Sequence, residues 1–217
     1  MPMIRSVNVG VAQDASWAGI GRTGIDKRPV EGPVEVHELG LAGDDVCDVR
    51  YHGGTDQAVY AYAREDLDRW QERLGTEIPD GHFGENLTTL GIDLNEAEIG
   101  ERWAVGTAEL EVCAVRTPCN DFKSWMGLTG HDNTAWVKRF TAEGRPGPYF
   151  RVTRAGVVAA GDEISVVHRP GHGVTVSLLF RSLTGEPALL PEVAAVAELG
   201  EKTRRRVAKR LRRAVSS

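Results

Sequence analysis

Residues 108–119 read AELEVCAVRTPC, and this stretch decides the fold. Apolar and polar side chains alternate along most of it, with Leu110 and Val112 on one face, which is the two-residue period of a β-strand. Pro118 then ends the strand, because proline has no N–H to donate to a sheet. The stretch predicts a strand that delivers the thiol of Cys119 to the rim of a β-structure.

Similar short strands are predicted on both sides of this stretch. The chain contains 25 glycines and 10 prolines, which favours many turns and short strands. The segments with strand-like patterns are 4–12, 33–44, 58–63, 86–92, 102–106, 149–156 and 162–169. We therefore predict a mainly β fold, a β-barrel with peripheral helices.

Two helices are predicted within this β-rich part. Residues 64–75 place apolar side chains three and four positions apart, the spacing of one helix face. Residues 132–144 form the second predicted helix, with Asp132 as its N-cap and with Val137 and Phe140, beside a tryptophan, facing inward.

The composition changes near residue 172. We predict a β-barrel domain over 1–171 and a small C-terminal region of three short helices over 172–217. Residues 201–213 hold eight Lys or Arg and one Glu, which leaves 18 basic and 30 acidic residues in the remainder. An acidic body argues against a nucleic-acid-binding domain. The basic run is most simply a solvated helix face, and a non-enzymatic binding module is the alternative.

The sequence favours a cytoplasmic protein with free thiols. No apolar run is long enough to span a bilayer, and the N-terminus has no basic head followed by an apolar segment. Its three cysteines, Cys47, Cys113 and Cys119, cannot all pair within the chain, and none belongs to a CxxC motif.

The role of Cys119 is open from its position alone. It could be a packing residue, a metal ligand or a nucleophile, whereas strand alternation assigns Cys113 to packing. Arg116 and Lys123 lie close in sequence, and nearby cations favour the thiolate, the form that ligates metals or attacks electrophiles. A zinc site built from Cys47, His52 and Cys119 matches no closed structural spacing.

Further candidate segments have both a structural and a functional interpretation. His52-Gly53-Gly54 followed by Asp56 is either a hairpin turn or a loop whose amides approach a ligand, which glycine permits because it has no Cβ. Residues 84–86, Gly-Glu-Asn, are either a turn or a recognition loop. The loop at 144–148 and the late strand at 149–156 each contain an arginine, and Arg145 and Arg151 are candidates for contact with an anion.

Four blocks, in order, resemble one family. They are GDDVCDVRYHGGTDQAVYAY (43–62), FGENLTT (83–89), EIGERWAVGTAELEVCAVRTPC (98–119) and GPYFRVTRAGVVAAGDEISVV (147–167). Together they are similar to the MOSC domain, named after the C-terminal domain of molybdenum-cofactor sulfurase, and the similarity covers about residues 35–168. The C-terminal helices resemble those of a stand-alone bacterial branch linked to resistance against N-hydroxylated purines.

The resemblance implies a β-barrel that binds a molybdopterin-type molybdenum cofactor. Cys119 matches the family cysteine, as a molybdenum ligand or as a sulfur carrier. The other implied cofactor-binding residues are Gly53, Gly54, Asp56, Gly84, Glu85, Asn86, Arg116 and Arg151. The family is also associated with pyridoxal phosphate, for which this sequence offers no support.

The implied function is a reductase of N-hydroxylated compounds. His52 is the candidate proton donor, since its side chain titrates nearest neutrality. The sequence has no flavin motif and no iron–sulfur cysteine set, so electrons are expected from a separate protein. Asn120 and Asp121 follow the cysteine where relatives commonly carry a basic residue, and an acidic neighbour is expected to oppose thiolate formation. A sulfur carrier with a persulfide on Cys119 is the alternative.

Overall fold

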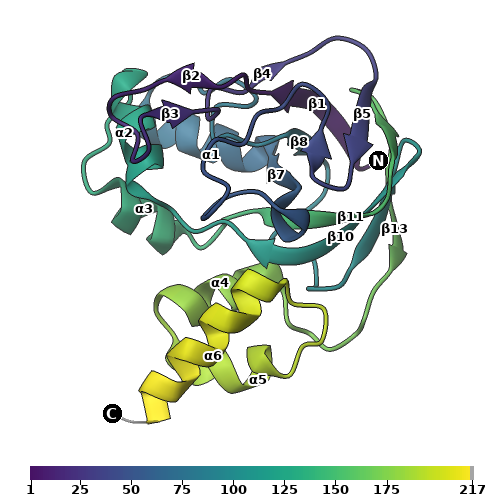
Figure 1. Ribbon diagram of the computed structural model, residues 1–217, viewed down its shortest axis with the longest axis vertical. Helices are drawn as coiled ribbons and strands as arrows, with labels where there is room; N and C mark the ends of the chain where they lie inside the picture. The colour runs from purple at the N-terminus through teal and green to yellow at the C-terminus, as the bar shows by residue number, and fades with distance from the viewer. Residues whose placement is uncertain (216–217) are drawn as a thin grey trace.

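Within residues 1–215, which the computed structural model describes, an eight-stranded sheet forms the centre (Figure 1). In spatial order its strands are β13 (Ile164–His168), β9 (Arg102–Val105), β10 (Ala108–Val115), β11 (Pro148–Arg154), β7 (Val59–Ala63), β8 (Leu87–Leu90), β1 (Met3–Val9) and β4 (Arg28–Pro29). β7 and β8 run parallel, and because a parallel pair needs a crossover, helix α1 (Arg64–Leu74) connects them. The strand predicted from AELEVCAVR is confirmed as β10.

Smaller elements complete the β-structure. A three-stranded sheet contains β12 (Gly156–Val158), β5 (Val34–His37) and β6 (Gly40–Leu41), and a hairpin contains β2 (Gln13–Asp14) and β3 (Arg22–Thr23). The remaining helices are α2 (Asn120–Leu128), α3 (Trp136–Glu143), α4 (Val176–Thr184), α5 (Leu190–Ala194), α6 (Glu201–Val215) and the 3₁₀ helices η1 (Thr55–Gln57) and η2 (Pro187–Leu189).

The predicted β-barrel is not closed, and the fold is mixed α/β rather than mainly β, with the predicted C-terminal helices present. The first residues of β1 meet the start of β13 and the turn before it through an isolated bridge, Met3 to Glu163. Three backbone hydrogen bonds accompany the bridge, from the Ile4 N–H to the Asp162 carbonyl at 2.8 Å, from the Gly161 N–H to the Ile4 carbonyl at 2.8 Å and from the Ile164 N–H to the Pro2 carbonyl at 3.0 Å. The last residues of β1 pair instead with β4. Because two segments share this edge of β1, neither forms a ladder long enough to close the sheet.

The two helices predicted within the β-rich part are confirmed, with two errors of detail in the second. α1 buries Leu67 and Trp70, as its spacing predicts. α3 buries Phe140, but Val137 is 37% exposed and does not face the core. Asp132 is not the N-cap, because its carboxylate accepts the N–H of Thr134 before the helix begins.

An aromatic cluster holds the helices against the sheet. Trp70 of α1, Phe122 of α2 and Trp136 of α3 surround Phe83, with ring centroids of Phe83 and Phe122 5.0 Å apart. Each such pair contributes roughly 1 kcal/mol beyond the burial of its area. The cluster therefore fixes the position of α2, which starts directly after Cys119.

Helices α4, α5 and α6 pack below β10 and β11, at the lower end of the molecule in Figure 1. The chain reaches them through residues 169–175, after β13 ends. Asp56, in η1, accepts the backbone N–H of Glu201 at 2.6 Å, at the first residue of α6. The C-terminal helices are thus joined to the segment that also carries His52. Within residues 1–215, no helix is both long and apolar enough to span a membrane.

Candidate functional site

One pocket lies where the ends of β7 and β10 meet the loops at 22–27 and 44–53. Its volume is about 120 Å³. The residues named from the sequence that line it are Cys47, His52, Gly53, Gly84, Asn86, Arg116, Cys119 and Asp121. These side chains come from segments far apart in the chain, so the fold brings them together.

Cys119 is the N-cap of α2. Its sulfur accepts the backbone N–H of Phe122 at 3.4 Å, and the side chain is half-buried. The sequence analysis missed this helix, although Phe122, Trp125 and Met126 follow at helical spacing. A thiol at a helix N-terminus lies at the positive end of the helix dipole, which favours a negative charge there.

Asp121 has a structural partner of its own. Both of its carboxylate oxygens accept the backbone N–H of Gly19, at 3.2 and 3.3 Å. This contact attaches the turn between β2 and β3 to the first turn of α2. The carboxylate also lies at a helix N-terminus, where an acidic residue is stabilising.

Arg116 is a buried cation that faces the pocket without a carboxylate partner. It is 7% exposed, and its guanidinium lies over the rings of Tyr60 and Phe122, 4.9 and 4.4 Å from their centroids. Within residues 1–215 no ion pair joins it to an Asp or Glu. Burial acts to lower its pKa, but the nearby Tyr60, Tyr149, Cys119 and Glu85 raise it above the usual value. A buried cation of this kind attracts an anion from solution.

Gly84 makes room for that guanidinium. Its φ is +77°, and a Cβ placed on it would lie 3.2 Å from Ile25 Cγ1 and 3.4 Å from Arg116 Nη1. A side chain there would be strained and would press on Arg116. The structure therefore favours glycine at position 84, the first position of the Gly-Glu-Asn block.

A second buried cation, missed by the sequence analysis, lies in the pocket wall. Lys27 forms an ion pair with Asp44, and both side chains are less than 10% exposed. Asn86 donates to the other oxygen of Asp44 at 2.9 Å and accepts the N–H of Tyr60 at 3.1 Å. Burial lowers the pKa of Lys27 despite Asp44, which opposes that change. Lys27 and Asp44 could not be found from the sequence because no motif links them.

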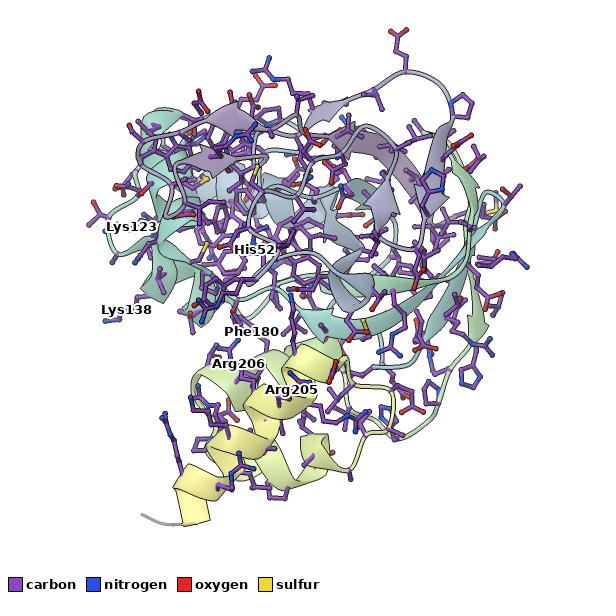
Figure 2. All side chains as sticks on the ribbon, viewed as in Figure 1. His52, Lys123, Lys138, Phe180, Arg205 and Arg206 are labelled. Atoms are coloured by element: carbon purple, nitrogen blue, oxygen red, sulfur yellow. The ribbon has the colours of Figure 1, made fainter. Side chains whose placement is uncertain are left out.

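His52 lies in the pocket wall and is half-buried. Burial lowers its pKa below 6.5, and Arg116 lowers it further, against the opposite effect of Asp48. Gly53, beside it, has φ +73°, and a Cβ there would come within 2.8 Å of Val46 Cγ1. Figure 2 labels His52 near the centre of the view.

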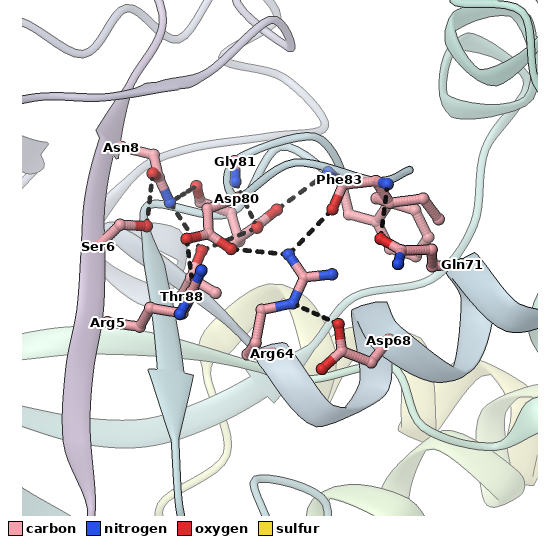
Figure 3. A network of polar contacts seen from close by, with 12 residues as sticks. Arg5, Ser6, Asn8, Arg64, Asp68, Gln71, Asp80, Gly81, Phe83 and Thr88 are labelled. Atoms are coloured by element: carbon pink, nitrogen blue, oxygen red, sulfur yellow. Dashed lines mark hydrogen bonds and ion pairs between the residues drawn. The ribbon is translucent and has the colours of Figure 1, made fainter. Parts of the chain in front are cut away.

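Glu85 serves the loop rather than the pocket. It is fully buried and accepts the N–H groups of Gly81 and Phe83 at 2.6 and 3.0 Å and the hydroxyl of Thr88 at 3.0 Å. Burial raises its pKa to about 7. Figure 3 shows this loop and the neighbouring ion pairs that hold it, among them Arg64 with Asp80 at 2.8 Å.

The structure does not bring Asp56 and Arg151 into the pocket. Their side chains form an ion pair at 2.9 Å, and Arg151 also contacts Glu111 and the carbonyl of Glu198. Gly54 likewise lies outside the pocket lining. Asp56 and Arg151 therefore contact the C-terminal helices rather than the pocket.

The two other cysteines and Arg145 lie in different parts of the fold. Cys113 is buried, as predicted, donates to the carbonyl of Asp56 at 3.2 Å, and burial raises its pKa to about 12. Cys47 lines the pocket. Arg145 pairs with Asp66 at 2.5 Å, away from it. No cluster of three or more His, Cys, Asp or Glu within residues 1–215 could hold a metal ion.

The pocket therefore contains two free thiols, Cys47 and Cys119, beside the buried guanidinium of Arg116, which has no carboxylate partner in the described chain. The chain belongs to the MOSC domain family, whose model matches residues 48–165. This family is typically associated with the molybdenum cofactor.

Individual relatives agree with this assignment. The chain is 30% identical over 199 residues to the uncharacterized protein YflK of Bacillus subtilis, covering 88% of each chain. It is similar to the crystal structure of YiiM from Geobacillus stearothermophilus, with a TM-score of 0.80, 29% identity and coverage of 97% of this chain and 100% of that one. A Gibberella moniliformis protein named "Reductase" is 30% identical over 176 residues, which are 77% of this chain and 30% of that protein.

Proposed function

We propose that this protein binds a molybdenum cofactor and reduces N-hydroxylated compounds. The observation that carries the proposal is the shared pocket of Cys119 and Arg116, a half-buried thiol beside a buried guanidinium that lacks an acidic partner. A thiolate is a soft ligand for a redox-active metal, and a guanidinium binds the anionic parts of a cofactor.

These residues fit the reactive end of such a cofactor. Cys119 would hold the molybdenum, and Arg116 would neutralise anionic oxygen or sulfur atoms beside it. The cavity of about 120 Å³ is smaller than the roughly 300–1,000 Å³ of typical ligand pockets, so it accommodates only the reactive end of such a cofactor. The cofactor, when bound, supplies the two-electron change, while the protein binds and orients the reactants.

The reaction breaks an N–O bond. R–NH–OH accepts two electrons and two protons and gives R–NH₂ and water. His52, which lines the pocket, would deliver a proton, and its lowered pKa would make the imidazolium a stronger acid than an exposed one. The electrons come from a separate redox protein. The relative named "Reductase" supports this type of reaction.

Metal analysis and an activity assay test the proposal together. Protein from a cofactor-producing host should contain molybdenum and pterin and should reduce N6-hydroxylaminopurine with dithionite-reduced methyl viologen. Cys119→Ala should lose the molybdenum and the activity. Molybdenum-free protein, or a Cys119→Ala variant with unchanged reduction, would refute the function.

A sulfur-carrier function is the second candidate, because Cys47 and Cys119 line the same pocket. A persulfide donor R–S–SH would transfer its outer sulfur to Cys119, which leaves R–SH and Cys119–S–SH. Incubation with a cysteine desulfurase and free cysteine should then add one sulfur atom to Cys119, removable by dithiothreitol. An unmodified Cys119 in the mass spectrum excludes this function.

A further inference from the structure

Helix α6 presents a row of cations to solvent while its apolar side packs inward. Val207 is 1% exposed and Leu211 is half-buried against the core. Arg206, Lys209 and Arg210 lie at positions i, i+3 and i+4, which places them on one face. We refer to these three residues together with Lys123 of α2 as the basic face.

The basic face borders the pocket. The guanidinium of Arg206 donates to the hydroxyl of Thr117 at 3.2 Å, two residues before Cys119. Lys123 lies in the first turns of α2 and is exposed. Figure 2 labels Lys123 and Lys138 at the left of the upper part of the molecule and Arg206 on α6 below them. Arg206 therefore brings a positive charge to the segment that leads to Cys119.

These cations lack acidic partners within the part of the chain that the structure describes. The ion pair within α6 joins Arg205 to Glu201, and none joins Lys123, Arg206, Lys209 or Arg210 to a carboxylate. Burial and the neighbouring charge of Arg210 lower the pKa of Arg206. Like charges three or four residues apart destabilise a helix by about 0.2–0.5 kcal/mol per pair. An anionic partner that binds Arg206, Lys209 and Arg210 would relieve this repulsion.

We propose that the basic face docks an acidic one-electron carrier protein, a ferredoxin or a flavodoxin. The inference rests on the proposed reductase function, and it assigns the place where electrons enter. Two reduced carriers each lose one electron, and together they supply the two electrons that cleave the N–O bond. The docked carrier would lie over the segment that contains Thr117 and Cys119, next to the pocket.

A nucleic acid fits the molecule less well than an acidic protein. Outside residues 201–213 the chain has 18 basic and 30 acidic residues, so an extended polyanion meets repulsion beyond the basic face. A protein with a local acidic patch can contact the basic face without extending over the acidic remainder of the surface. Charge complementarity of this kind mainly accelerates association and depends strongly on salt.

Binding measurements on the full-length holoprotein test the docking surface. A plant-type [2Fe–2S] ferredoxin and a flavodoxin serve as probes, titrated at low and at high NaCl concentration. Arg206→Glu with Arg210→Glu should weaken binding by roughly tenfold or more at low salt, whereas the charge-conserving Arg206→Lys with Arg210→Lys should retain it. Arg28→Glu with Arg154→Glu, distant exposed arginines, is the control with the same change in net charge.

Activity measurements separate this inference from the proposed function. The doubly reversed variant should lose activity with reduced carrier protein but keep its rate with dithionite-reduced methyl viologen. No viologen activity in the wild type refutes the reductase function, while the binding experiment still decides the docking surface. Binding of neither carrier, or equal losses in the control, overturns the inference. So does salt-dependent binding of a duplex DNA in their place.

Discussion

The sulfur of Cys119 accepts the backbone N–H of Phe122 at 3.4 Å and so caps helix α2. The same atom lines the pocket beside Arg116. A structural role and a chemical role are therefore combined in one thiol. Because serine is a good N-cap residue but a poor ligand for a soft metal, substitution can separate the two roles.

Cys119→Ser should keep the fold and lose the cofactor. We expect its free energy of unfolding to equal or exceed that of the wild type, since the hydroxyl replaces the weaker sulfur cap. Cys119→Ala should lose about 0.5–1 kcal/mol, because an N–H of the first turn loses its partner. Urea denaturation measures both values on cofactor-free protein. A Cys119→Ser variant that retains molybdenum would contradict the assignment of the sulfur as metal ligand.

Arg116 should contribute to ligand binding rather than to stability. The cost of removing the Arg116 guanidinium from water cancels much of the stabilisation that its ring contacts provide. Arg116→Met should therefore change the free energy of unfolding by less than about 1 kcal/mol. Arg64 is equally buried but paired with Asp80, and Arg64→Met should cost about 3–5 kcal/mol. Urea denaturation of cofactor-free proteins compares the two. Equal losses would show that Arg116 is structural.

The longer strands were predictable from the sequence, but the two-residue strands β2, β3 and β4 and part of the site were not. The alternation of apolar and polar residues located β10. The pairing of β10 with β11 is irregular between Val112 and Ala114, and this irregularity shifts the register of the two strands. The residues that surround Arg151 on β11 could therefore not be inferred from the sequence. Pro118 was interpreted as the end of a strand, and the helix after it was overlooked. Lys27 and Asp44 meet only through folding of two loops, which no local pattern records.

His82 should make stability depend on pH. Burial, with His131 nearby, lowers its pKa from 6.5 to about 4, so the folded protein binds fewer protons than the unfolded chain between these values. Its contribution is complete above pH 6.5 and is lost as the pH falls to 4, with a maximum of about 3 kcal/mol. The difference in the free energy of unfolding between wild type and His82→Gln should therefore become smaller as the pH falls from 6.5 to 4. A difference that is constant from pH 7 to 4 would disprove it.

Lys202 should hold the loop that covers the pocket. Its ammonium group donates to the carbonyls of Val49 and Gly53 at 3.4 and 3.1 Å, which joins α6 to the 44–53 loop. Since these exposed contacts are weak, Lys202→Met should leave global stability within about 0.5 kcal/mol of wild type. Amide hydrogen exchange over residues 46–53 should nevertheless accelerate by roughly threefold, because local opening becomes easier. Lys209→Met, on the same helix, should leave this exchange unchanged; equal rates in both variants would rule out the restraint.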